Sequence, residues 1–176
     1  MGFFSIILSN LRNMKKAKKY RQMGKDALLA LNDDDFYEAV ECMCNNAVFD
    51  IHAKTLTHEQ ILVYSLCRFE AEVNNGGLCQ FFVNSSSECA PYISEAMEAI
   101  GAINLQNLFV SFVTENGIDV NNLSSFKISS VAEFAEQTER FDFDSFDDRF
   151  YEDINFHQQI ITYARKHIEQ LIQDSI

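Results

Sequence analysis

The chain has 176 residues, of which 47% are hydrophobic, and a formal net charge of −12. This length fits one domain, and this apolar content excludes a chain that is disordered by composition. One proline and six glycines are too few for the turns of a many-stranded β protein, so an all-α, compact multi-helix fold is predicted.

The charge is distributed unevenly along the chain. Residues 1–25 contain seven lysines or arginines and no acid, which gives them a charge of +7. The remaining 151 residues therefore carry a charge of −19, and the whole chain has a net charge of −12. A body with this charge repels nucleic acid and attracts basic proteins. The predicted organisation is a basic amphipathic helix over residues 1–24 and a single all-helical domain over residues 25–176.

The N-terminal segment pairs an apolar stripe with a lysine cluster. The stripe recurs at helical spacing at Phe3, Ile6, Ile7, Leu11 and Met14. It is too short to span a bilayer, and its positive charges follow the apolar run, which is the reverse of a secretory signal. Two interpretations remain: peripheral membrane contact through residues 1–21, or docking on the acidic body or on a second copy.

Five cysteines, an odd number, occur within apolar helical patterns. This distribution favours buried, reduced thiols in a cytoplasmic protein over a disulfide framework.

Several helices are predicted between residues 25 and 113. Asn32 is the expected N-cap of a helix whose apolar positions begin at Phe36, and Thr57 with Gln60 forms a capping box that opens the clearest helix of the chain. That helix is predicted to end at Asn75-Gly76, with Gly76 in the left-handed conformation. A short helix over residues 78–84 and helices around residues 91–100 and 105–113 follow.

The last third of the chain is strongly patterned but partly ambiguous. Residues 118–129 are predicted to be irregular, and Ser130 with Glu133 forms a second capping box. In the helix that follows, the side chains predicted to face the core are Val131, Phe134, Ala135, Thr138 and Phe141. Residues 141–144 alternate like a strand, although the acids after them follow a helical stripe. One long C-terminal helix is predicted from Phe156 to Ile172.

A corner segment, EVNNGGLCQFFVN at residues 72–84, joins two predicted helices and combines amides with bulky apolar residues. Buried amides need hydrogen-bond partners, so the segment is predicted to form either a structural network or a pocket for a small ligand or peptide. The residues of this predicted site are Glu72, Asn74, Asn75, Gly76, Gly77, Gln80, Phe81, Phe82 and Asn84.

A second candidate surface is the stretch 133–153, which holds nine acids against Arg140 and Arg149. Like charges at i, i+4 destabilise a helix by about 0.2–0.5 kcal/mol per pair, and Asp144, Asp148 and Glu152 form two such pairs. A row of carboxylates resembles the regular charge of a DNA strand. Besides a simple solvated surface, the stretch therefore predicts an acidic face for a basic partner, made of Glu133, Glu136, Glu139, Asp144, Asp148 and Glu152.

No catalytic signature is present in the sequence. There is no His-Glu-x-x-His, Cys-x-x-Cys, phosphate loop or nucleophile elbow, and Asn74 to Gly77 lacks the lysine that a phosphate loop needs. Glu70 and Glu72 are two apart on a helix and do not face each other as an acid and base pair. No catalytic residue, metal site or cofactor is predicted, and the chain is not expected to be an enzyme.

The corner segment resembles the signature of a bacterial domain family of largely unknown function that includes a DNA-mimic protein. The shared pattern is Glu72, Asn75-Gly76-Gly77, a hydrophobic Leu78, Gln80-Phe81-Phe82 and Asn84. The run FDSFDDRFYED also resembles the second signature of the family, and the likeness extends over about residues 25–175. The resemblance implies an all-helical fold, a capacity to form homodimers and DNA mimicry. The resemblance supports assigning the family's residues to the corner segment. It does not support the same assignment for the acidic surface, because surface charge diverges more readily.

The predicted function is an acidic, non-catalytic interaction protein, a DNA mimic that occupies the nucleic-acid-binding face of a basic or DNA-binding protein. The body itself is not expected to bind nucleic acid. The alternative is an immunity-type inhibitor, or a module that binds a small ligand or peptide at the Asn-Gly-Gly corner.

Overall fold

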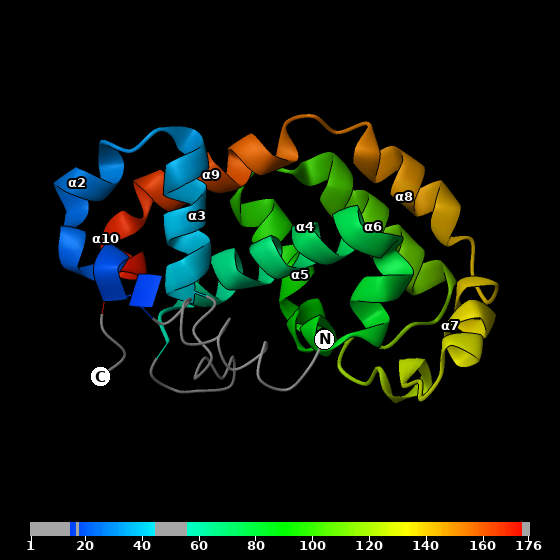
Figure 1. Ribbon diagram of the computed structural model, residues 1–176. Helices are drawn as coiled ribbons and strands as arrows, with labels where there is room; N and C mark the ends of the chain where they lie inside the picture. The colour runs from blue at the N-terminus through cyan, green and yellow to red at the C-terminus, as the bar shows by residue number, and fades with distance from the viewer. Residues whose placement is uncertain (1–14, 17, 45–55, 174–176) are drawn as a thin grey trace. The chain divides into compact units, whose positions relative to one another are not determined.

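The computed structural model describes residues 15–16, 18–44 and 56–173 (Figure 1). These residues form α-helices and short 3-10 helices, and none of them is in a β-strand, so the all-α prediction is confirmed. Most of the predicted N-terminal amphipathic helix lies at residues 1–14, outside the described residues. No helix in the described ranges combines the length and the apolar character needed to cross a membrane.

The chain divides into two compact units. Unit 1 comprises residues 1–64 and 161–176, and unit 2 comprises residues 65–160. Helices α4 (His58–Val83) and α9 (Phe156–Lys166) each contribute residues to both units. The predicted boundary near residue 24, between the N-terminal helix and the helical domain, is not tested by this division and stays a prediction.

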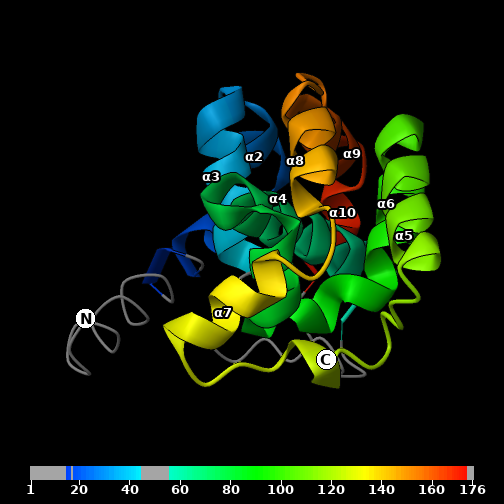
Figure 2. The same ribbon diagram turned by 90° about the vertical axis from the view of Figure 1, so that its right-hand side faces the viewer.

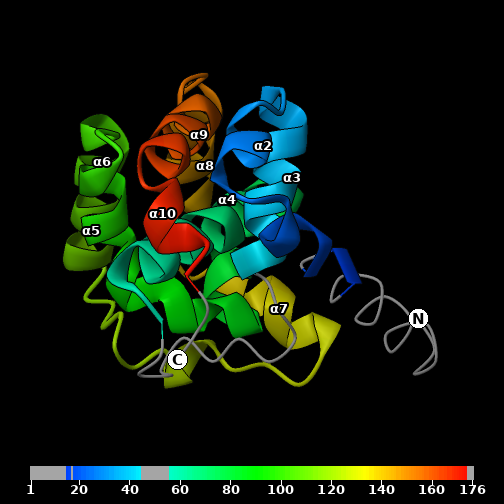
Figure 3. The same cartoon turned by 90° about the vertical axis from the view of Figure 1, so that its left-hand side faces the viewer.

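Unit 1 contains α2 (Lys25–Leu29), α3 (Asp33–Cys44) and α10 (Ile168–Leu171) (Figure 3). Asn32 caps α3 as predicted, because its Oδ1 accepts a hydrogen bond of 2.9 Å from the backbone N–H of Asp35. Arg165 ties α9 to the segment between α2 and α3. Its guanidinium donates to the carbonyl oxygens of Leu29 and Leu31 at 3.0 and 2.9 Å and to Asp33 at 2.8 Å.

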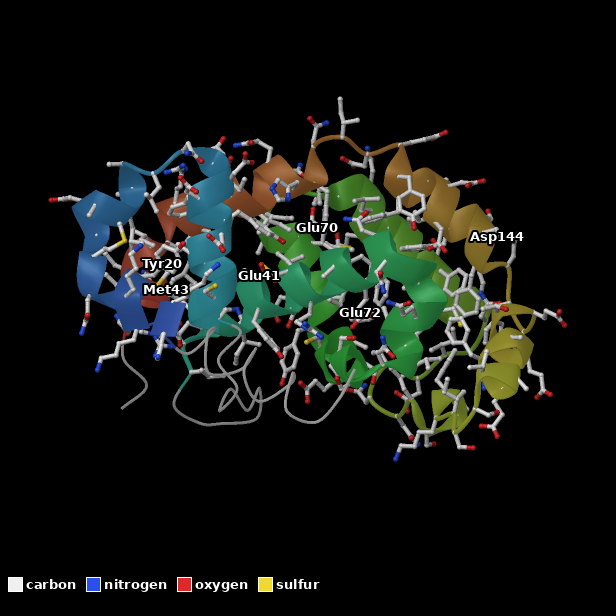
Figure 4. The ribbon with its side chains drawn as sticks, in the orientation of Figure 1. Tyr20, Glu41, Met43, Glu70, Glu72 and Asp144 are labelled. Carbon is white, nitrogen blue, oxygen red and sulfur yellow. The ribbon has the colours of Figure 1, made fainter. Side chains whose placement is uncertain are left out.

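Residues 15–16 and 18–23, described parts of the basic segment, are helical and contact α3 (Figure 4). Lys16 and Tyr20 both bond to Glu38, with the Tyr20 hydroxyl at 2.9 Å, and Arg21 donates to the carbonyl of Met43 at 3.0 Å. Burial, followed by the hydrogen bond with Glu38, raises the pKa of Tyr20 to about 12. These contacts agree with docking on the body. Membrane contact through residues 1–21 stays a prediction.

Unit 2 is built around an aromatic core centred on Phe69 of α4. The Phe69 ring meets five others at centroid distances between 5.0 and 6.4 Å, all edge to face, which is a favourable geometry for aromatic pairs. One of those rings belongs to α4 itself and the other four to three further helices, so the core joins four helices, whose ribbons are drawn in Figure 2. The rings are Phe81, Phe109, Phe146, Phe150 and Phe156.

The remaining elements of unit 2 follow α4 in chain order: η1 (Ser85–Cys89), α5 (Ala90–Ala99), α6 (Ile103–Glu115), η2 (Ser124–Phe126), α7 (Val131–Thr138) and α8 (Phe143–Tyr151). Pro91 occupies the first turn of α5, as predicted. The ambiguous stretch after residue 141 is helical, and α8 buries Phe143, Phe146 and Phe150 on one side.

Two details of the predicted helices are wrong. The C-terminal helix is broken at His167 (φ −106°, ψ 21°) into α9 and α10. Helix α7 buries none of its residues, and Val131, predicted to face the core, is 87% exposed. Periodicity identifies the apolar side of a helix but does not show whether another layer of the protein covers that side.

The five cysteines are free thiols, and four of them are buried, in agreement with the predicted reduced state. Burial raises the pKa of Cys44 and Cys89 to about 12 and that of Cys79 to about 11, so these thiols stay protonated and unreactive at neutral pH. Cys42 is the partly exposed one.

A disulfide reagent that reacts with thiolates should therefore modify Cys42 first in the native protein. This reaction should be slow, because burial raises the pKa of Cys42 as well. All five thiols should react after denaturation. Cys42→Ser should remove the first phase alone; a second thiol reacting equally fast in the native protein would contradict the assigned burial.

Candidate functional site

The corner segment lies within α4, which begins as predicted. Thr57 and Gln60 form a reciprocal capping box, with the Gln60 N–H donating to Thr57 Oγ1 at 3.1 Å and the Thr57 N–H to Gln60 Oε1 at 2.9 Å. The helix is interrupted at Gly76 (φ −170°, ψ 27°) and Gly77 (φ 79°, ψ 177°). The positive φ was predicted at Gly76 and belongs instead to Gly77, the residue that needs the conformational freedom of glycine.

Glu72 is the acceptor on which the polar side chains of the corner segment converge. Its Oε2 accepts hydrogen bonds of 2.8 Å from both Gln80 Nε2 and Asn84 Nδ2. Its Oε1 accepts from the buried Ser86 hydroxyl at 2.8 Å and lies 3.4 Å from the Arg68 guanidinium. Glu72 is only 9% exposed, so its carboxylate depends on these donors in place of water. The donors come from both sides of the interruption and from η1.

Burial raises the pKa of Glu72, but the hydrogen bonds from Gln80, Asn84 and Ser86 lower it by more, so that its pKa lies below the usual value. An ionised acceptor makes stronger hydrogen bonds than a neutral one. The network therefore depends on the charge of Glu72, and it supports the structural interpretation of the corner segment.

The other predicted corner residues divide between surface and core. Asn74 and Asn75 are exposed, and their side chains make no hydrogen bond with any residue that the structure describes. They do not belong to the Glu72 network, contrary to the prediction that grouped all the amides. Phe81 and Phe82 are at most 1% exposed and pack in the aromatic core.

Asp147 of α8 completes the site, and the sequence prediction missed it. Its Oδ1 accepts the backbone N–H of Leu78 at 2.8 Å. A Cβ atom added to Gly77 would lie 2.1 Å from Asp147 Oδ2, so glycine leaves the space that the carboxylate fills. Burial, against the hydrogen bond from Leu78, raises the pKa of Asp147, as do the charges of Asp144 and Asp148.

Tyr151, one turn further along α8, donates from its hydroxyl to the carbonyl of Val73 at 2.6 Å. Helix α8 thus holds α4 on both sides of the glycines, through Val73 before them and Leu78 after them. The only sequence signal for this pairing was the joint presence of the Asn-Gly-Gly pattern and the FDSFDDRFYED run, because the two are about 70 residues apart.

Glu70 and Glu72 face different partners, as their spacing predicted (Figure 4). Glu70 is 7% exposed and its carboxylate lies 3.1 and 3.2 Å from His157 Nδ1, on α9. The two carboxylates therefore stabilise separate contacts of α4.

The predicted acidic face is distributed over α7 and α8. Glu136 is exposed on α7 and Glu139 at its C-cap. Asp144 and Asp148 are exposed along α8, and Glu152 is exposed at its C-cap. Glu133 is engaged at the start of α7, where its carboxylate accepts from the Ser129 N–H at 2.6 Å and from the Ser129 hydroxyl at 2.9 Å. Figures 1 and 2 both place α7 and α8 at the same end of unit 2.

In the described ranges, no group of three or more histidine, cysteine, aspartate or glutamate side chains is arranged to hold a metal ion. The three acids of the first turn of α3, Asp33 to Asp35, lie where carboxylates favour the positive end of the helix dipole.

Comparison with known protein families identifies a match over most of the chain. The family described as "DMP19-like protein" matches residues 54–167, which include the whole of the corner segment and of α8. No curated protein matches the chain. No solved structure matches it either.

Proposed function

Because the chain belongs to the DMP19-like family, a family of DNA mimics, we propose that it is an acidic, non-catalytic interaction protein that occupies the nucleic-acid-binding face of a basic protein. The observation that carries the proposal is a row of three unpaired carboxylates on α8 and its C-cap. This row, Asp144, Asp148 and Glu152, is called the α8 ridge below.

Each member of the α8 ridge is exposed, and none has an ion pair or a side-chain hydrogen bond with a described residue. Glu136 and Glu139 of α7 have the same character. Unpaired carboxylates keep their full charge available to a partner. By contrast, Glu72 in the corner segment and Asp147 in α8 accept hydrogen bonds from donors within the protein.

The spacing of the ridge suits a surface that normally binds phosphates. Successive members are four residues apart on a helix, which corresponds to about 6 Å along the axis. A DNA strand presents one charge about every 3.4 Å along the axis. Lysines and arginines arranged for alternate phosphates would therefore find carboxylates at similar positions, and such pairing speeds association and selects partners by charge.

The alternative function, a ligand or peptide site built from the corner amides, has less support. The donors of Gln80 and Asn84 that the site would need are used by Glu72, and the exposed Asn74 and Asn75 lie outside that network.

Immobilised full-length protein should capture basic, DNA-binding proteins from a lysate of the source cells. Excess double-stranded DNA should elute them, because DNA and the ridge would compete for one surface. Binding should weaken as salt rises from 0.05 to 0.5 M, since the Debye length falls below about 10 Å above 0.1 M. Captured proteins that DNA does not displace would contradict mimicry.

The matched control separates the ridge from total charge. Asp144→Asn, Asp148→Asn and Glu152→Gln together should weaken capture by roughly tenfold, at about 0.5 kcal/mol for each exposed charge. The fold should not suffer, because like-charge repulsion on α8 is relieved. Glu88→Gln, Glu98→Gln and Glu115→Gln remove equal charge from exposed positions elsewhere in unit 2 and should leave capture nearly unchanged.

A further inference from the structure

An apolar groove of about 510 Å³ lies between the second half of α4 and α7. Its apolar walls are Val83, Ile128, Val131 and Phe134, and Gln80 and Asn84 of the corner segment form its polar edge. No charged side chain lines it. The groove exists because α7, which the sequence predicts to be a core-facing helix, leaves its apolar side uncovered.

Polar contacts, in place of apolar burial, hold α7 in this position. Ser130 caps its first turn, accepting from the Glu133 N–H at 3.2 Å. Gln137 Nε2 and Arg140 Nη1 both donate to the carbonyl of Ser125, at 2.8 and 3.3 Å. An isolated helix of eight residues is unstable in water, so these ties keep α7 formed while its apolar residues stay accessible.

The groove is uncharged, but its surroundings are acidic. Glu136 and Glu139 occupy the exposed side of α7, and the α8 ridge follows after a connection of four residues. The segment 133–153 carries nine acids and two basic residues. An occupant that satisfied both features would insert an apolar side chain into the groove and place lysines or arginines beside the acids.

We infer that the groove between α4 and α7 binds a large aliphatic or aromatic side chain of a basic protein segment, whose flanking lysines or arginines contact the acids of α7 and the α8 ridge. The inference rests on the proposed function and adds an apolar anchor to it. Binding energy at protein interfaces is concentrated in buried anchors of this kind, whereas exposed charges contribute mainly to the rate and selectivity of association.

Two synthetic peptides of equal charge test this directly. Both carry four lysines, and they differ only at two central positions, which are leucine in one and serine in the other. Fluorescence anisotropy with the full-length protein should give at least fivefold tighter binding for the leucine peptide. The advantage should persist at 0.5 M salt, because apolar burial is not screened as charge pairing is.

Val131→Ser locates the effect. Val131 is 87% exposed, so its replacement should leave the fold intact, and the leucine advantage should fall to about twofold or less. Val110→Ser on α6 is the matched control, since Val110 is 40% exposed and lies outside the groove, and it should leave the advantage unchanged.

Equal affinity for the two peptides would overturn the anchor while leaving the charged face in place. Binding of neither peptide would overturn both the anchor and the proposed function. A leucine advantage that survives Val131→Ser, or that Val110→Ser abolishes, would show binding elsewhere and would also overturn the inference.

Discussion

Glu72→Ala should lower the free energy of unfolding by about 2–4 kcal/mol, because it leaves buried donors without an acceptor and each such donor costs about 1–3 kcal/mol. The substitution leaves Gln80, Asn84 and Ser86 facing a space without an acceptor, and it removes the bonds that join Glu72, before the glycine interruption, to these donors after it. Urea unfolding followed by circular dichroism measures the change. Glu136→Ala, on the exposed side of α7, is the control and should change stability by less than about 0.5 kcal/mol.

The same network predicts a pH dependence with a definite sign. Hydrogen bonds lower the pKa of Glu72 in the folded protein, so the folded state binds fewer protons here than the unfolded state. Stability from this group is therefore complete above the unfolded pKa of about 4.3 and is lost as the pH falls through the lower folded value.

The stability difference between wild type and Glu72→Gln should accordingly be largest near pH 7 and shrink below about pH 4. A difference that does not change with pH would mean that Glu72 acts through its shape and not through its charge.

Gly77→Ala should cost about 2–6 kcal/mol, for two reasons that can be separated. The combination of φ 79° and ψ 177° is unfavourable for any residue with a Cβ, at roughly 1–3 kcal/mol. The added Cβ would also overlap Asp147 Oδ2 and displace the carboxylate from the buried Leu78 N–H, at a further 1–3 kcal/mol or so. Thermal unfolding measures the sum.

Gly24→Ala is the matched control for the backbone term. Gly24 has nearly the same conformation as Gly77, with φ 75° and ψ 165°, and an added Cβ would meet nothing within 4 Å, so only the conformational cost applies. Gly77→Ala should therefore be clearly more destabilising than Gly24→Ala. Equal costs would mean that the approach of Asp147 is unimportant.

Asp147→Asn tests the acceptor without the charge. The amide oxygen can still accept the Leu78 N–H, while the buried charge beside Asp144 and Asp148 is removed, so stability should be equal or higher at neutral pH. The sign follows from the raised pKa of Asp147, because stability from a group whose folded pKa is raised decreases as the pH rises. Asp147→Ala, which loses the acceptor, should be destabilising.

The sequence by itself determined the helices and their beginnings. The capping box at Thr57 and the caps at Asn32 and Ser130 are local hydrogen bonds within a few residues, and each cap forms as predicted. The box predicted at Ser130 is not reciprocal, because the Glu133 carboxylate accepts from the Ser129 N–H instead of the Ser130 N–H. The apolar repeats also predicted helices where α3, α5 and α6 form, and Phe36, the first expected apolar position of α3, is completely buried. The corner pattern also pointed to the family before any geometry was known.

The tertiary structure decided which of these residues act together. Asp147 is one of nine acids in a stretch of 21 residues, and only its proximity to Gly77 and Leu78 distinguishes it from the exposed carboxylates beside it. Likewise, Val131 and Phe69 are both apolar residues at helical spacing, yet one is exposed and the other is completely buried. Local sequence fixes backbone conformation through short-range sterics and hydrogen bonds, whereas burial and electrostatic pairing depend on residues that are distant in the chain.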